Sequence, residues 1–202
     1  MRHLLGLVAA TLLVGGGCVV QPLGPDHCTQ GACQEACSDA SCTLECEGGG
    51  CAQTCDSDKQ CDAACGLGGC RQTCTAETCT ASCDGGGCDS TCDGGACALS
   101  CDDGSCQQHC GATSCMEDCD AGGCQQQCSD EGCTLGCEGG GCRQRCDGPS
   151  CDTTCAGGAC DVTCAGTCTV SCPAESCVLH CPPSAPETSC TTGLVACGPC
   201  QL

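Results

Sequence analysis

The sequence lacks most of the residues that build a conventional protein core. It contains no Phe, Tyr or Trp, and after position 18 it has only 8 Leu, 6 Val and no Ile. A chain this poor in large apolar side chains cannot bury enough surface to offset the entropy of ordering. Something other than a hydrophobic core must therefore hold it together: covalent cross-links or bound metal.

Positive charge is also scarce. Outside residues 1–17, 4 Lys and Arg face 25 Asp and Glu, which gives a net charge of −21 (4 − 25). Such a surface repels nucleic acid and anionic lipid headgroups, so we expect no nucleic-acid partner.

Nothing in the sequence indicates catalysis. His27, His109 and His180 are scattered without a recurrent partner, and no Gly-rich loop ends in Lys. The pair Cys197–Cys200 has the C-x-x-C spacing of redox motifs, but it lies outside any β-α-β pattern. We predict that the protein is not an enzyme and has no cofactor, apart from weakly bound calcium.

What the chain does have is cysteine: 39 of 202 residues, together with 32 Gly. This proportion is typical of disulfide scaffolds in exported proteins. The amino terminus agrees with export. Arg2 and His3 precede an apolar run, Leu4 to Val14, and three glycines, which is the layout of a secretory signal peptide. The run is too short to span a bilayer, which needs about 20 apolar residues.

The small residues followed by Cys18 resemble the lipobox of bacterial lipoproteins, although Gly15 stands where that family favours Leu. The resemblance covers residues 1–18. It implies that Cys18 becomes the first mature residue and carries a lipid that anchors the chain to a membrane. Val19 after the Cys implies the outer membrane or cell surface. Cleavage by an ordinary signal peptidase within 15–17 is the alternative and would give a secreted protein. The odd cysteine count also fits, since a lipidated Cys18 leaves 38 to pair.

The body of the chain is one short repeat. Seventeen C-x-x-x-C units run from Cys33–Cys37 to Cys177–Cys181, and fourteen of the sixteen steps between them are nine residues. The two exceptions, of ten and eight residues, fall between units. Because length variation belongs to turns, C-x-x-x-C is the regular element and the Gly- and Asp-rich gap is the turn.

A period of two places both cysteines and the middle residue of each unit on one face of a short strand. Many middle residues are apolar, such as Leu44, Leu99 and Leu135, but others are glutamine: Gln53, Gln72, Gln108, Gln126 and Gln144. We predict a disulfide-rich repeat protein, an elongated solenoid-like stack of C-x3-C-x4 nonapeptides. It consists of short β-strands and Gly/Asp turns, with little helix after the signal peptide. Two nonapeptides per coil would give about eight coils. Irregular disulfide-stapled turns and single helical turns stay as alternatives.

The predicted organisation has five parts. These are a signal peptide at 1–17, an anchor and tether at 18–27, the repeat array at 28–181, a Pro-rich linker at 182–189 and a C-terminal cysteine module at 190–202.

Geometry narrows the disulfide pairing. The ends of an extended C-x-x-x-C lie roughly 13 Å apart, beyond the reach of a disulfide. One consistent solution pairs cysteines across each turn, from Cys28–Cys33 and Cys37–Cys42 through Cys172–Cys177. Cys181–Cys190 and Cys197–Cys200 would complete it. Stacked pairing between neighbouring coils is the alternative.

Two kinds of metal site compete with this interpretation. Metallothioneins are similar in combining many Cys with no aromatics, but their ligands cluster as C-x-C and C-x-x-C, and here the one such pair is Cys197–Cys200. The nine-residue period with Gly/Asp turns resembles the calcium-binding nonapeptide repeats of secreted β-rolls, which implies calcium at the turn acids. The candidate ligands are Glu47, Asp84, Asp93, Asp102, Asp120 and Glu138. Solvated acids that keep the rod soluble are the alternative role for them.

Together these features predict an exported, lipid-anchored protein of the cell envelope with a structural or adhesive role. Its partner is the membrane, reached through lipid on Cys18, and no patch of the sequence identifies a protein or surface partner. The alternative is a metal-binding protein that uses either cysteine thiolates or the acidic turns.

Overall fold

The structure is a computed structural model of the whole chain, and it describes residues 19–21, 31–173, 176–191 and 193–200. These residues form twenty strands joined by turns. They include no helix of the length and apolarity that crossing a membrane requires.

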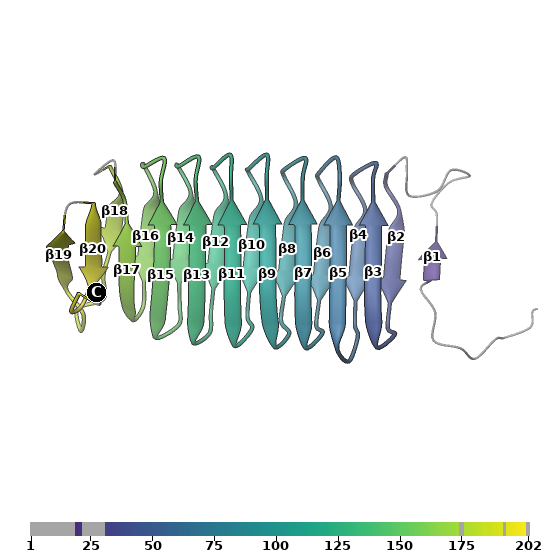
Figure 1. Cartoon of the computed structure of the whole chain (residues 1–202), viewed down its shortest axis with the longest axis horizontal. Coiled ribbons are helices and arrows are strands. Elements are labelled where there is room, and N and C mark those ends of the chain that lie inside the picture. The colour runs from purple at the N-terminus through teal and green to yellow at the C-terminus, as the bar shows by residue number, and fades with distance from the viewer. Residues whose placement is uncertain (1–18, 22–30, 174–175, 192, 201–202) are drawn as a thin grey trace, which may run out of the picture.

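The strands form two ten-stranded sheets that face each other along a rod (Figure 1). Sheet A contains, in spatial order, β1 (Val19–Gln21), β2 (Gln34–Cys37), β4 (Ala52–Cys55), β6 (Arg71–Cys74), β8 (Asp89–Cys92), β10 (Gln107–Cys110), β12 (Gln125–Cys128), β14 (Arg143–Cys146), β16 (Asp161–Cys164) and β18 (Val178–His180). Sheet B contains β3 (Ser41–Cys46), β5 (Gln60–Cys65), β7 (Thr78–Cys83), β9 (Ala96–Cys101), β11 (Ser114–Cys119), β13 (Gly132–Cys137), β15 (Ser150–Cys155), β17 (Thr167–Ser171), β20 (Leu194–Cys197) and β19 (Glu187–Thr191).

Successive units alternate between the sheets, so two nonapeptides make one coil. Strands of neighbouring coils pair in parallel, and each residue meets the one that lies two nonapeptides further along the chain, as in Gln107 with Gln125. The ten-residue step lengthens this separation by one position, as in Ser41 with Gln60. The fold is a β-solenoid with about eight coils, as the spacing predicted. The two alternatives, helical turns and irregular turns, are wrong.

The period-two prediction also holds inside each unit. Burial alternates strictly along the strands, as in Ser41–Cys46, where the two cysteines and Leu44 are buried and their neighbours are exposed. Sheet B contributes one column of middle residues to the interior: Leu44, Ala63, Ala81, Leu99, Glu117, Leu135, Thr153 and Val170. Cysteines and this narrow column take the place of a conventional core.

The glutamines that argued against a strand also lie inside, on sheet A. Gln72 Nε2 donates to Gln53 Oε1 (3.1 Å), and the same nitrogen reaches the carbonyl oxygens of Ala63 and Ser82 across the interior (3.1 and 3.0 Å). A second run repeats the pattern, with Gln126 donating to Gln108 (3.1 Å) and Gln144 to Gln126 (3.0 Å). Because the coils stack in register, neighbouring amides meet and most of their buried polar atoms are hydrogen-bonded; the exception is Gln144 Oε1 at the end of the second run, which has no partner in the described residues.

Disulfides close every coil twice, across each of its two turns. One ladder spans the turns from sheet A to sheet B: Cys37–Cys42, Cys55–Cys61, Cys74–Cys79, Cys92–Cys97, Cys110–Cys115, Cys128–Cys133, Cys146–Cys151 and Cys164–Cys168. The other spans the turns from sheet B to sheet A: Cys46–Cys51, Cys65–Cys70, Cys83–Cys88, Cys101–Cys106, Cys119–Cys124, Cys137–Cys142, Cys155–Cys160 and Cys172–Cys177. This is the turn-spanning pairing that the sequence predicted, and stacked pairing between coils is wrong for these cysteines. The predicted pair Cys28–Cys33 cannot be followed, because Cys28 lies outside the described residues. Cys33 is buried and has no disulfide within them.

The predicted pairing of the last four cysteines is wrong. Cys181 bonds to Cys197 and Cys190 bonds to Cys200, not Cys181 to Cys190 and Cys197 to Cys200. The reason is a change of topology after the last coil. The chain forms an antiparallel hairpin, β19–β20, and β20 pairs antiparallel with β17, which brings Cys197 beside Cys168.

Both ends of the array therefore carry strands that run differently from the coils. At the amino-terminal end β1, which falls within the predicted tether, pairs antiparallel with β2. At the carboxyl-terminal end β19 begins at Glu187, inside the predicted Pro-rich linker. Irregular end strands of this kind close a repeat array against further pairing.

Candidate functional site

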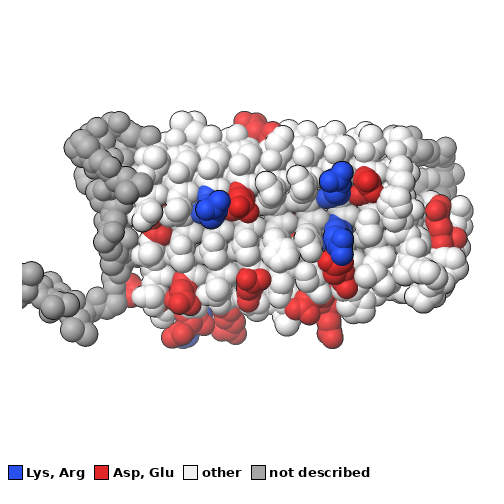
Figure 2. All heavy atoms as spheres, turned by 180° about the vertical axis from the view of Figure 1, so that it is seen from behind, with Lys and Arg blue, Asp and Glu red and all other residues white. Residues whose placement is uncertain are grey.

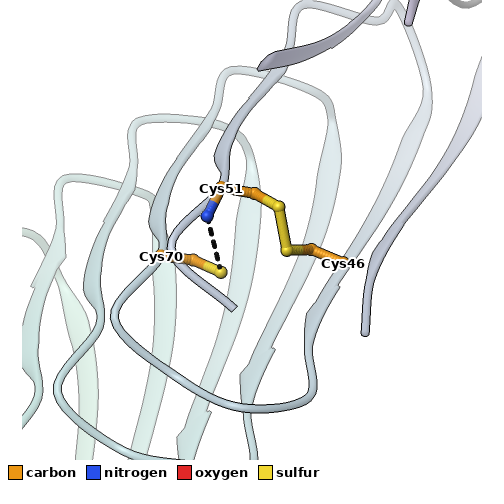
Figure 3. A group of neighbouring side chains, drawn as sticks. All are labelled: Cys46, Cys51 and Cys70. Carbon is orange, nitrogen blue, oxygen red and sulfur yellow. Dashed lines mark hydrogen bonds between the residues drawn. A yellow bond between two sulfur atoms is a disulfide. The ribbon is translucent and has the colours of Figure 1, made fainter. Parts of the chain in front are cut away.

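The sulfur atoms form the densest group of candidate ligands in the described part of the protein. Sγ atoms of neighbouring coils gather in buried groups of three, such as Cys46, Cys51 and Cys70, with all three within 4.8 Å of one another. Figure 3 shows this group: Cys46 and Cys51 are bonded, and the backbone N–H of Cys51 donates to Cys70 Sγ at 3.4 Å. Metal binding by cysteine needs thiolates, whereas these sulfurs are joined in disulfides. In the oxidised protein the sulfur groups therefore act as cross-links.

The predicted calcium ligands divide between the two edges of the rod. Glu47, Asp84, Asp102, Asp120 and Glu138 each open a turn from sheet B to sheet A, whereas Asp93 opens a turn from sheet A to sheet B. The backbone keeps the first set in register, since the N–H of Asp102 bonds to Cys83 O and that of Asp120 to Cys101 O, both at 3.0 Å. The structure thus brings five candidates onto one edge and places Asp93 on the other.

Within that row, the carboxylates of successive coils repel one another. The pKa of Asp102 is raised above its usual value, first by partial burial and then by repulsion from Asp120, Asp84, Asp103 and Asp118. All six predicted candidates are nonetheless solvent-exposed. An exposed row of this kind attracts cations by its field.

Histidines and arginines lie together on the outer face of sheet A, a grouping that was not predicted from the sequence. Figure 2 shows this face, where arginine side chains (blue) lie beside acidic ones (red); the histidines are among the residues drawn in white. Arg71 pairs with Asp89 (3.5 Å), Arg145 with Asp147 (2.9 Å), and His180 Nε2 with Asp161 (3.1 Å). The sequence does contain a pattern that predicts this grouping. These residues flank the middle position of alternate units, and a repeat of two nonapeptides places alternate units on the same sheet.

No pair of histidines in the described residues could share a catalytic task in this arrangement. His109 lies on β10 and His180 on β18, four strands apart in sheet A. Cys197 and Cys200, the C-x-x-C pair, each bond to a different cysteine. His27 and the predicted lipidation residue Cys18 lie outside the described residues.

No family model matches this chain, and no curated protein or solved structure does. The assignment of function therefore depends on the molecule itself. Its 18 disulfides in the described residues indicate an extracellular or otherwise oxidising environment. A rod stapled twice per coil fits a structural role.

Proposed function

We propose that the protein is exported, anchored to a membrane by lipid on Cys18, and works at the cell surface as a structural or adhesive rod. The observation that carries the proposal is the pair of disulfide ladders, which fix the length and shape of each coil independently of any apolar core. The signal-like residues 1–17 and the lipobox-like Cys18 support export and anchoring.

Cell fractionation tests the anchor. The full-length chain should sediment with the membrane fraction, and Cys18→Ser should move it to the soluble exported fraction, because a thioether-linked lipid cannot form on serine. Membrane association of Cys18→Ser equal to that of the unaltered chain would contradict the lipid anchor.

Thiol counting tests the disulfide rod. Protein from the native envelope, alkylated without reduction, should take up almost no label. After reduction it should take up label at the 36 cysteines of the 18 disulfides. Extensive labelling before reduction, together with bound zinc or copper, would favour the thiolate alternative.

Calcium binding is the second candidate, favoured by the in-register row of Asp84, Asp102 and Asp120. Calcium titration followed by circular dichroism, with disulfides intact, should show binding that the triple Asn variant loses. Asp152→Asn, on the outer face of sheet B, is the control. An unchanged response in the triple variant would remove this candidate.

A further inference from the structure

One part of the outer face of sheet A carries a different kind of side chain from the outer face of sheet B. Where β10, β12 and β14 lie side by side, its outward positions hold only long planar polar groups: Gln107, His109, Gln125, Gln127, Arg143 and Arg145. At the matching positions, β13 presents Thr134 and Gly136. Amides, imidazole and guanidinium offer hydrogen bonds in fixed planes, so this part of the face is equipped for recognition.

These side chains line a shallow open groove of about 260 Å³ that runs from β8 to β14. Two of the groups lining it, Arg143 and Arg145, are guanidinium cations, one, His109, is an imidazole, and one, Asp89, is acidic. Its volume lies just below the range of about 300–1,000 Å³ usual for small-molecule sites. The groove therefore has room for one small ligand and not for a longer chain of units.

The groove is held in place by a residue at its rim. Asp147, in the turn after β14, accepts the Nε–H of Arg145 with both carboxylate oxygens (2.9 Å each) and a hydrogen bond from Gln127 Nε2 (3.0 Å). The Arg145 side chain is still 57% exposed. Since the ion pair uses Nε, the terminal guanidinium nitrogens keep the fork that binds a carboxylate. Fixing both side chains beforehand lowers the entropic cost of binding.

Charge limits the ligand. The mature chain carries a net −21 (4 − 25), so a long polyanion is repelled by the acidic edges of the rod. A single anionic group on an otherwise neutral, hydroxyl-rich body avoids that repulsion and still meets Arg143 and Arg145. No aromatic side chain exists in the chain to stack on a ring, so recognition depends on hydrogen bonds.

We propose that this groove binds one acidic sugar, a carboxylate-bearing monosaccharide at the end of a glycan. Arg143 and Arg145 take the carboxylate, and Gln107, Gln125 and Gln127 take the hydroxyls. The inference deepens the adhesive form of the proposed function and rests on it, because it names what the rod would adhere to.

Isothermal titration of the oxidised chain with galacturonic acid tests this, with galactose and acetate as companion ligands. Galacturonic acid should bind at least tenfold more tightly than either companion. The double variant Arg143→Gln/Arg145→Gln should lose at least tenfold in affinity. Lys59→Gln is the control, since it also removes positive charge but lies in the turn between β4 and β5, away from the residues that line the groove.

Three results would overturn the inference: no binding of galacturonic acid by the unaltered chain, binding of acetate or galactose equal to it, or an equal loss of affinity in Lys59→Gln. Each variant is first checked for intact disulfides by thiol counting. Failure here with membrane sedimentation unchanged would remove the sugar site alone, whereas loss of sedimentation or of the disulfides would remove the proposed function.

Discussion

Glu117 occupies the middle position of β11, between Leu99 of the preceding coil and Leu135 of the following coil. It is fully buried, and neither carboxylate oxygen has a hydrogen-bond partner among the described residues. Burial raises the pKa of Glu117 from 4.5 to about 8, and a contact with the backbone of Gln127 offsets this only in part. The side chain is therefore protonated in the folded protein near neutral pH.

This residue makes stability depend on pH. Between pH 4.5 and about 8 the unfolded chain releases the Glu117 proton while the folded chain holds it, so stability falls as pH rises through this window and levels off above it. Glu117→Gln should remove that slope and stabilise the fold by up to about 5 kcal/mol at pH 8. Guanidinium unfolding of the oxidised protein, followed by circular dichroism at pH 4.5 and pH 8, measures both.

Glu45→Gln provides the comparison, because Glu45 lies exposed on the outer face of the same sheet. It should leave the pH dependence unchanged. A slope that survives Glu117→Gln would show that other groups dominate the titration.

At the scale of elements, the turns from sheet B to sheet A are packed backbone on backbone. Gly140 has φ +76°, and a Cβ added there would overlap the carbonyl oxygen of Gly158 in the next coil. Gly141 has φ +69° but faces open space, with nothing within 4 Å of an added Cβ. Substituting Gly141 therefore tests only the energetic cost of a positive φ, whereas substituting Gly140 adds the cost of a clash with the neighbouring coil.

Gly140→Ala should therefore destabilise the rod far more than Gly141→Ala, whose cost should stay near the ~1 kcal/mol of a left-handed alanine. Hydrogen exchange of the backbone amides in coils on either side measures the difference. Equal protection of these amides from exchange in the two variants would mean that neighbouring turns can move apart without loss of stability.

The strands and most of their cross-links could be predicted from the sequence because each depends on local spacing. The alternation within C-x-x-x-C, the coil of two units and the turn-spanning disulfides all follow from a short period inside each unit and a longer one between units. The interior role of the glutamines could not be predicted, since it depends on amides of different coils meeting in register. The pairing of Cys181 with Cys197 could not be predicted either, because it depends on a hairpin that reverses the chain direction.

The candidate sites show the same division. The register of the acidic turns followed from the repeat, and only Asp93 lies on the opposite edge. The groove on sheet A could not be predicted from the nine-residue period. Its side chains come from every second unit, and the units between them belong to sheet B.

At the scale of the whole molecule, one complete coil of two nonapeptides is the part that can be removed. Deleting 107–124 takes out two complete disulfides, Cys110–Cys115 and Cys119–Cys124, and joins Cys106 to Gln125 in a new C-x-x-x-C. We expect a fully oxidised rod that is shorter by about 4.8 Å. Small-angle X-ray scattering and thiol counting check length and oxidation.

Deleting 107–115 is the contrasting change. It removes one disulfide and keeps every spacing, but it exchanges the sheets for all later strands. Gln126 would then stack on Leu99 instead of Gln108 and lose the amide oxygen that accepts its hydrogen bond. This variant should unfold at lower guanidinium concentration than the whole-coil deletion. Equal stability would mean that the buried middle residues of sheet A, with their glutamines, and those of sheet B can exchange places without loss.

The short span of the disulfides bears on how the rod is made. Each ladder bond joins cysteines only four to six residues apart, whereas the strands it connects pair with strands that lie one full coil away along the chain. An oxidant can therefore close each bond as soon as its own turn has emerged, before the next coil exists to be mispaired with. We expect each oxidised coil then to offer its strand edges as the template for a neighbouring coil. A chain with 39 cysteines has an enormous number of wrong pairings available, and this order of events keeps almost all of them out of reach.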